Sequence, residues 1–323
     1  MRSLFRARIV LFVSVLLVGL ASKSRATFEE DEDGEVKKAA PTRILFVGDV
    51  MLDGGPGNVV ASGKDPFEHT SALFQDVDLA IANLECVIGR GGEQRLKPYV
   101  FRGASDSPRF LKKYFHAVGL ANNHSMDFGP EGMEAMLDVL EKEELPYFGA
   151  GRNLKQANKP FLFESNGHKI AILAFNEFHA EEYAATKEKA GNAPLFEKVV
   201  TREIKRARVE LECDVVIPFL HWGEELMPEP RPDQREMARK WIDAGATAVI
   251  GAHPHITQTI ETYRGAPIVY SLGNFAFDYF PVDPPEWTGW VAIVVIDESG
   301  KTGLEIRSVT LDPAGCPRIS ATE

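Results

Sequence analysis

The sequence predicts an α/β protein in which short buried strands alternate with amphipathic helices. Apolar runs such as 43–47, 78–82 and 246–250 have the length and composition of buried strands. Between such runs, apolar residues recur at helical spacing, for example over 201–212 and 233–244. Several runs end in a carboxylate, an amide or an imidazole. Because ligands usually bind at the carboxyl edge of an α/β sheet, the same pattern predicts where a site lies.

The first 26 residues have the order of a secretory signal peptide. Three arginines precede an apolar run over 9–20, and small residues at 24 and 26 have the spacing that a signal peptidase accepts. The run is shorter than a typical membrane span. We therefore expect an exported protein, periplasmic or extracellular, from which residues 1–26 are cleaved. A retained N-terminal anchor, and with it membrane association, is the alternative.

The chain is acidic, with 36 basic and 47 acidic residues and a formal net charge of −11. Removal of residues 1–26 takes five basic residues away and leaves 31 against 47, a charge of −16. Such a charge argues against nucleic-acid binding. Residues 27–41 begin with an acidic run and are expected to form a disordered leader before a single domain over 42–312 and a tail over 313–323.

Three cysteines, Cys86, Cys213 and Cys316, are too few and too scattered for a disulfide framework. A single bridge is one alternative, but buried free thiols explain the odd number more simply. The positions of the cysteines also exclude a thiolate metal site.

Two carboxylates follow the first two predicted strands. Asp49 comes just after the strand over 43–47, and Glu85 comes just after the strand over 78–82. Both are expected at the carboxyl edge of a sheet. A glycine-rich, basic loop over 89–102 follows, with Lys97 and Arg102. In so acidic a chain these two cations are candidates to contact an anionic substrate, with ordinary surface charges as the alternative.

A helix is predicted over 108–117, because Pro108 suits a first helical position and Asp106 or Ser107 can cap it. The short strand after it ends in Asn122-Asn123-His124. Amide and imidazole groups are costly to bury without partners, so they are expected to belong to a site. A further helical pattern places four apolar residues in the core: Met133, Met136, Leu137 and Leu140.

A hairpin is predicted over 161–176, turning at Asn166-Gly167. The strand over 214–220 runs directly into His221. Asn274 follows the strand over 267–272 in the same way. The chain ends in a predicted antiparallel pair: 290–296 and 304–311.

His253 and His255 follow the strand over 246–250. In extended backbone, alternate residues share a side, so both imidazoles would aim at one locus if the segment stays extended. Imidazole is the commonest transition-metal ligand, which makes the pair a plausible half-site. Two polar residues on an exposed loop are the alternative.

Together, six strand ends or the loops after them carry polar residues that can bind a metal. The mixture of carboxylate, amide oxygen and imidazole suits Mn, Fe or Zn better than Ca or Mg. A carboxylate can bridge two such ions about 3.5 to 4 Å apart, the arrangement that activates water and polarises a phosphoryl oxygen.

At these residues the sequence resembles the calcineurin-like metallophosphoesterases, and more closely their capsule-biosynthesis branch, the CapA or poly-γ-glutamate synthesis family (PGA_cap). The resemblance covers about 43–278. Its motifs are Gly48-Asp49-Val50-Met51-Leu52, Ala82-Asn83-Leu84-Glu85, Phe101-Arg102, Leu120-Ala121-Asn122-Asn123-His124, His221-Trp222-Gly223, Gly251-Ala252-His253-Pro254-His255 and Ser271-Leu272-Gly273-Asn274-Phe275.

The resemblance implies a four-layer αββα metallophosphoesterase-like sandwich of two packed mixed sheets, with two divalent metal ions. It implies that Asp49, Glu85 and His255 hold one ion, with Glu85 bridging to the other. The second ion would be held by Glu85, Asn123, His221 and His253. His124 would lie outside the metal ligands and donate a proton to the leaving group or stabilise charge. The expected substrate contacts are Lys97, Arg102 and Asn274.

Met51 departs from the wider superfamily, which has a histidine ligand two residues after the first aspartate. A thioether is a poor replacement for that imidazole. Glu85 likewise replaces a shorter aspartate.

Two functions remain open. One is an exported, metal-dependent hydrolase of the phosphoesterase type in capsule or poly-γ-glutamate synthesis. It would act on a phosphoester or a cell-envelope polymer, beside membrane-bound capsule synthesis machinery, and the presence of His124 favours this function. The other is a non-catalytic component for export or anchoring of the capsule polymer that keeps the fold and part of the metal binding; Met51 favours it.

Overall fold

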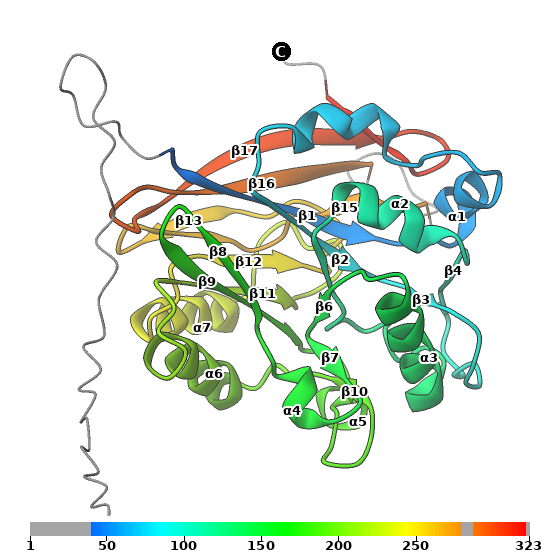
Figure 1. Ribbon diagram of the computed structural model, residues 1–323, viewed down its shortest axis with the longest axis horizontal. Helices are drawn as coiled ribbons and strands as arrows, with labels where there is room; N and C mark the ends of the chain where they lie inside the picture. The colour runs from blue at the N-terminus through cyan, green and yellow to red at the C-terminus, as the bar shows by residue number, and fades with distance from the viewer. Residues whose placement is uncertain (1–39, 279–286, 321–323) are drawn as a thin grey trace, which may run out of the picture. The chain divides into compact units, whose positions relative to one another are not determined.

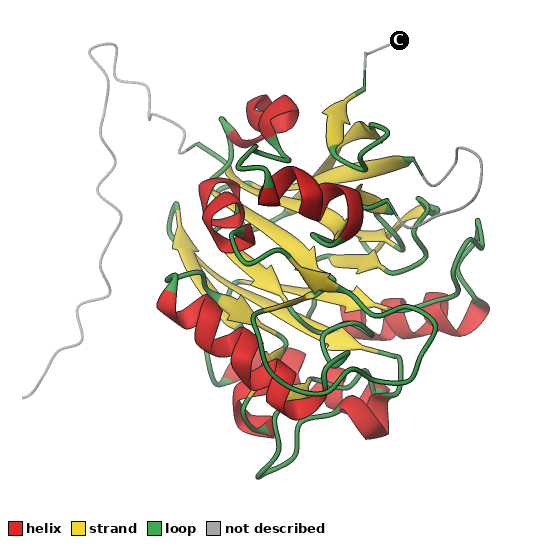
Figure 2. Ribbon diagram, turned by 90° about the vertical axis from the view of Figure 1, so that its right-hand side faces the viewer, coloured by secondary structure: helices red, strands yellow, loops and turns green. Residues whose placement is uncertain are grey.

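Two packed β-sheets with helices on their outer faces form the domain (Figures 1 and 2). The computed structural model describes residues 40–278 and 287–320. The expected signal peptide, most of the expected leader and the last three residues of the expected tail lie outside the described residues. Within the described ranges, no helix combines the length and apolar character needed to cross a membrane.

The first sheet has eight strands in the described residues, in the order β18-β17-β16-β1-β2-β5-β6, with β15 paired beside β1. β1, β2, β5 and β6 run parallel, whereas β16, β17 and β18 add antiparallel neighbours. The bounds are β1 Thr42–Val50, β2 Leu79–Leu84, β5 Ala117–Gly119, β6 Tyr147–Phe148, β15 Asn274–Ala276, β16 Thr288–Ile296, β17 Thr302–Leu311 and β18 Pro317–Ile319. β18 lies within the segment expected as a tail, so the sheet extends beyond residue 312.

The second sheet has six strands in the described part of the chain, in the order β13-β14-β12-β11-β9-β8. Its four central strands are parallel, and the β8–β9 hairpin turns at Asn166-Gly167 as predicted. The bounds are β8 Phe161–Ser165, β9 His168–Asn176, β11 Val215–His221, β12 Val249–Ala252, β13 Ile260–Tyr263 and β14 Ala266–Val269. Two small ladders pair β3 (Val87–Ile88) with β4 (Arg102–Gly103) and β7 (Ala150–Gly151) with β10 (Gly191–Asn192).

The helices of the described residues are α1 Gly54–Ala61, α2 Ser107–Tyr114, α3 Gly129–Lys142, α4 Leu154–Ala157, α5 Ala180–Tyr183, α6 Glu197–Val209 and α7 Pro232–Asp243, with a 3₁₀ helix over Glu68–Phe74. The four apolar residues predicted for the core of α3 are fully buried. α6 begins four residues before the predicted start at 201, and α1 has no counterpart among the predicted helices.

The alternation of side chains along the strands creates the four layers. In β1, Ile44 and Phe46 join the cluster between the sheets, whereas Leu45 and Val47 join the cluster under α1, α2 and α3. The second sheet does the same, since its outer face packs with Ile204 of α6 and Trp241 of α7. These layers confirm the α/β class and the two packed mixed sheets that the sequence predicts. The three cysteines are buried and free, as expected.

Candidate metal centre

Parallel strands of both sheets deliver polar residues to one place. The register of β1 puts Asp49 opposite Asn83 of β2 and opposite Asn274 of β15. From the other sheet, the His253 backbone N–H donates to Asp49 Oδ2 over 3.1 Å. The candidate ligands therefore converge from the carboxyl ends of strands that belong to different sheets.

One half of the centre is formed by Glu85, Asn123, His221 and His253. His221 Nε2 lies 2.8 Å from Asn123 Oδ1, 3.1 Å from His253 Nδ1 and 3.4 Å from Glu85 Oε1. Glu85, His221 and His253 are buried and form a group of suitable spacing for a metal ion. Three predicted ligands thus form one group, and the fourth, Asn123, contacts it through His221.

The other half is formed by Asp49, Glu85 and His255, which make a second buried group of metal-ligand spacing. His255 Nδ1 lies 3.4 Å from Asp49 Oδ2 and 2.9 Å from Asn274 Oδ1. Asn274 Nδ2 also donates to the His255 backbone oxygen over 3.2 Å. Asn274, predicted as a substrate contact, is thus placed against the imidazole of His255.

The donor set fits divalent metal ions. Both carboxylate oxygens of Glu85 are buried and have no hydrogen-bond partner within the described residues. Burial, and next the charge of Asp49, raise the pKa of Glu85 well above its ordinary value. Burial lowers the pKa of His221 to about 3 and that of His253 well below its usual range, so both imidazoles are neutral. Neutral imidazole is the form that a cation requires, and a bound cation would favour the ionised form of Glu85 that burial disfavours.

His253 and His255 converge, although the backbone is not extended, the condition under which the sequence would bring them together. β12 ends at Ala252, and His253 and His255 have φ angles of 98° and 59°. These left-handed conformations are uncommon for residues with a Cβ. They bring the ring centroids of the two histidines to 5.6 Å, and the ring of Phe178 packs 3.9 Å from that of His253. The convergence therefore comes from a strained turn fixed by its surroundings.

Gly251, two residues before His253, permits a close approach to other segments of the same chain. A Cβ at this position would lie 2.0 Å from the backbone oxygen of Tyr270 and 2.6 Å from Trp222 Nε1. Only glycine permits such an approach without movement of the backbone.

His124 lies in a second, adjoining network. Its Nδ1 is 2.8 Å from Asp127 Oδ2, and the ring of Phe101 packs 4.2 Å from the imidazole. Burial lowers the pKa of His124, and the hydrogen bond to Asp127 opposes this shift. Asp127 itself is fully buried, accepts the Phe101 N–H over 2.7 Å and pairs with Lys97 Nζ over 2.5 Å.

The two predicted cationic contacts differ in position. Lys97 belongs to the site, since its Nζ pairs with Asp127 and donates to the Asn123 backbone oxygen over 2.9 Å. The Arg102 guanidinium instead donates to backbone oxygens of its own loop, at Gly89 and, over 3.0 Å, at Gly91. It also lies 3.5 Å above the ring centroid of Phe128. The structure therefore brings Lys97, but not Arg102, into contact with the candidate ligands.

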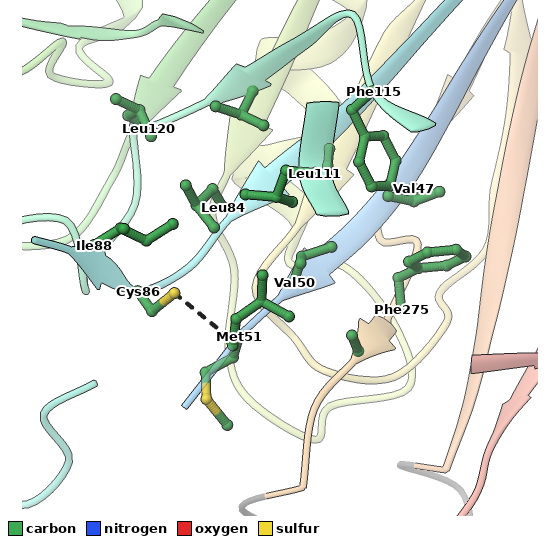
Figure 3. Packing of buried hydrophobic residues seen from close by; sticks show 14 of the residues in the cluster. Val47, Val50, Met51, Leu84, Cys86, Ile88, Leu111, Phe115, Leu120 and Phe275 are labelled. Carbon is green, nitrogen blue, oxygen red and sulfur yellow. Dashed lines mark hydrogen bonds between the residues drawn. The ribbon is translucent and has the colours of Figure 1, made fainter. Parts of the chain in front are cut away.

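Met51 points into apolar surroundings. Its side chain is fully buried in the cluster that contains Val50, Leu84 and Phe275 (Figure 3). The Asp53 N–H donates to the Met51 sulfur over 3.1 Å. The thioether is thus a packing group with a local hydrogen bond.

The sequence predictions missed three residues of the site. Asn83 Nδ2 donates to Asp49 Oδ1 over 2.7 Å and lies 3.0 Å from His221 Nδ1. Asp127 holds His124, as described above. Glu225 forms a third group of metal-ligand spacing with His253 and His255. The only signal in the sequence that could have found them is their closeness to predicted ligands: Asn83 lies two residues before Glu85, and Glu225 lies four residues after His221.

The two packed mixed sheets with helices on their outer faces define a protein of the metallophosphoesterase fold. Among solved structures, a 5′-nucleotidase precursor from Thermus thermophilus is similar, with a TM-score of 0.53 at 12% identity, over 86% of this chain and 56% of that one. This likeness concerns the fold and agrees with the predicted four-layer sandwich.

The sequence comparisons narrow the class to a family. The family described as "Bacterial capsule synthesis protein PGA_cap" matches residues 43–279, so the chain belongs to that family. The PGA biosynthesis protein CapA of Bacillus subtilis (strain 168) is 34% identical over 72% of this chain and 62% of its own length. The capsule biosynthesis protein CapA of Bacillus anthracis is 31% identical over 73% and 59%. The match thus spans about three fifths of these relatives.

Proposed function

We propose that this protein is an exported, metal-dependent hydrolase of the phosphoesterase type that acts on a phosphoester or cell-envelope polymer during capsule synthesis. The observation that carries the proposal is Glu85, whose two buried oxygens lack hydrogen-bond partners among the described residues while neutral imidazoles lie around them. A carboxylate is retained in such a place when a cation offsets its burial. Membership of the PGA_cap family supports the capsule context.

The residues divide the chemistry between them. Asp49, Glu85 and His255 would hold one divalent ion, and Glu85, Asn123, His221 and His253 the other, with Mn, Fe or Zn suited to these donors. Such ions supply Lewis-acid polarisation of a phosphoryl oxygen and activation of water. The choice of Mn, Fe or Zn rests on the chemistry of these ligands alone.

His124 would supply the proton. Its Nδ1 faces Asp127, which leaves Nε2 as the nitrogen that would carry a proton to the departing oxygen in the imidazolium form, which Asp127 stabilises against burial. Asp127 orients the ring, and Lys97, held by the same carboxylate, places a positive charge beside it.

A second function rests on Met51. A chain with an apolar packing group where the superfamily has a histidine ligand would keep the fold and bind fewer ions, as a non-catalytic component for export or anchoring of the capsule polymer.

Metal content and turnover distinguish the two. The purified chain should hold two divalent ions and hydrolyse aryl phosphate mono- or diesters, with activity lost in chelator and restored by Mn²⁺, Fe²⁺ or Zn²⁺. One ion or none, without turnover on any ester, would support the second function instead.

Export and contact with membrane-bound synthesis machinery are part of the proposal. The order of charged, apolar and small residues over 1–26 supports export. The N-terminus of secreted material should then lie at or near Thr27. Full-length chain with an intact Met1 in the membrane fraction would indicate a retained anchor.

A further inference from the structure

The two halves of the metal centre have unequal numbers of donors. Of the ligands that the resemblance implies, Asn123, His221 and His253 join Glu85 on one side, and Asp49 and His255 join it on the other. Met51 does not make up the difference, because its side chain is fully buried in the apolar cluster and its sulfur accepts the Asp53 N–H. The Asp49–His255 half is therefore open to a further donor.

Glu225 lies at the open side. It follows the end of β11 by four residues, after a turn at Gly223 with φ of 95°. Its Oε1 is 4.0 Å from His253 Nε2, and its carboxylate shares a group of metal-ligand spacing, within 4.8 Å, with His253 and His255. The side chain is 56% exposed, so rotation about its bonds can shorten these distances without repacking.

The orientation of His253 assigns Glu225 to one half of the centre. Its Nδ1 faces His221, 3.1 Å away, whereas its Nε2 faces Glu225. The carboxylate therefore lies beside the ring nitrogen of His253 that does not face His221, and it is also within metal-ligand spacing of His255, which belongs to the group with Asp49.

Charge favours the same assignment. Two divalent ions bring four positive charges into a site whose predicted carboxylate ligands, Asp49 and Glu85, are both buried and carry at most one negative charge each. A third carboxylate offsets part of the excess, and its hard anionic oxygen suits Mn²⁺ better than a thioether does.

We infer that Glu225 is a further metal ligand, which supplies a carboxylate to the ion held by Asp49 and His255 in place of the histidine that Met51 replaces. This inference rests on the proposed metal centre. It adds one exposed ligand, from the loop after β11, to a site whose other carboxylate and imidazole ligands are buried.

The test is a Mn²⁺ titration of the metal-free full chain, with free Mn²⁺ counted by electron paramagnetic resonance. Glu225→Gln keeps the size of the side chain and removes its charge; Glu224→Gln is the matched control, since Glu224 is also exposed and belongs to none of the groups found in the described residues. The parent and E224Q should bind two ions. E225Q should bind one ion as tightly as the parent and the second about 10- to 100-fold more weakly, the loss typical when a metal site loses a supporting group.

The outcomes separate this inference from the proposed function. If the parent binds two ions and E225Q binds both as tightly as the parent does, Glu225 is not a ligand. That result would be explained by a role in which Glu225 only orients His253 through a hydrogen bond to Nε2, because the amide oxygen of glutamine can accept the same bond. If E224Q loses the second ion as E225Q does, the effect is one of general charge and the inference fails. A parent without metal overturns the proposed function and this inference together. In chelator, all three proteins should unfold at the same temperature, which excludes misfolding as the cause.

Discussion

The two halves of the candidate metal centre differ in how far their ligands are assembled by the protein alone. In the half with Asn123, His221 and His253, side-chain atoms approach each other to 2.8 and 3.1 Å. In the half with Asp49 and His255, the imidazole is held by Asn274 over 2.9 Å, and the carboxylate–imidazole distance of 3.4 Å equals that between Glu85 and His221 in the first half. The better-assembled half is therefore the one in which four predicted donors meet, and we expect it to bind its ion more tightly.

The largest effect is expected from His221→Ala. His221 contacts every other donor of the better-assembled half, so its loss removes an imidazole that water replaces poorly. We expect the tighter ion to be lost, with affinity reduced by more than ~100-fold, and turnover to fall with it.

The matched control for this variant is His168→Ala. His168 lies at the start of β9, and its Nε2 lies 2.9 Å from the Asp297 backbone oxygen, outside the site. Metal analysis of both proteins after dialysis provides the measurement. Equal metal content in H221A and H168A would show that His221 is not a ligand.

His255→Ala should have a smaller effect and test the asymmetry directly. We expect the loss of one ion, with the other still bound at the affinity of the parent, because Glu85, Asn123, His221 and His253 remain in place. A calorimetric titration with Mn²⁺ or Zn²⁺ resolves the two steps. If H255A loses both ions together, the halves are coupled rather than unequal.

His124→Ala should leave both ions bound and slow the chemical step. General-acid assistance typically gives ~10²- to 10⁴-fold in rate, or about 3 to 5 kcal/mol of transition-state stabilisation. The loss should shrink for esters with good leaving groups, which need little protonation. Rates on a series of aryl and alkyl phosphates, with metal content measured on the same samples, check this. A fall in metal content with no dependence on the leaving group would mean that His124 only orients Asn123.

Most of the strand pattern could be predicted because it rests on local chemistry. The β8–β9 hairpin depends on Asn166-Gly167, and β16 and β17 are long strands that pair as expected. α1 was missed since it contains three glycines and a proline, residues that favour turns, and its N-terminus is set by Asp53, whose side chain accepts the Gly54 N–H.

The site was predicted less completely, because contacts between distant segments decide it. Arg102 and Lys97 are both cations of one loop, yet one pairs with backbone oxygens of that loop and the other with Asp127. Nothing local in the sequence distinguishes them. The left-handed backbone at His253 and His255 is likewise a tertiary effect, since the side chains alone favour other conformations.

The smallest effect is expected from Met51→Leu, which tests the side of the centre that departs from the superfamily. Leucine has nearly the volume of methionine, and such swaps in a packed core typically cost less than about 1.5 kcal/mol. The sulfur acceptor of the Asp53 N–H is lost, so a small destabilisation is expected in denaturant unfolding. Metal content and turnover should stay at parental values, because the Met51 side chain is fully buried in the apolar cluster and its sulfur accepts the Asp53 N–H. If M51L loses an ion while its stability stays within that range, the thioether is a ligand after all, and the Asp49–His255 half would need no donor from Glu225.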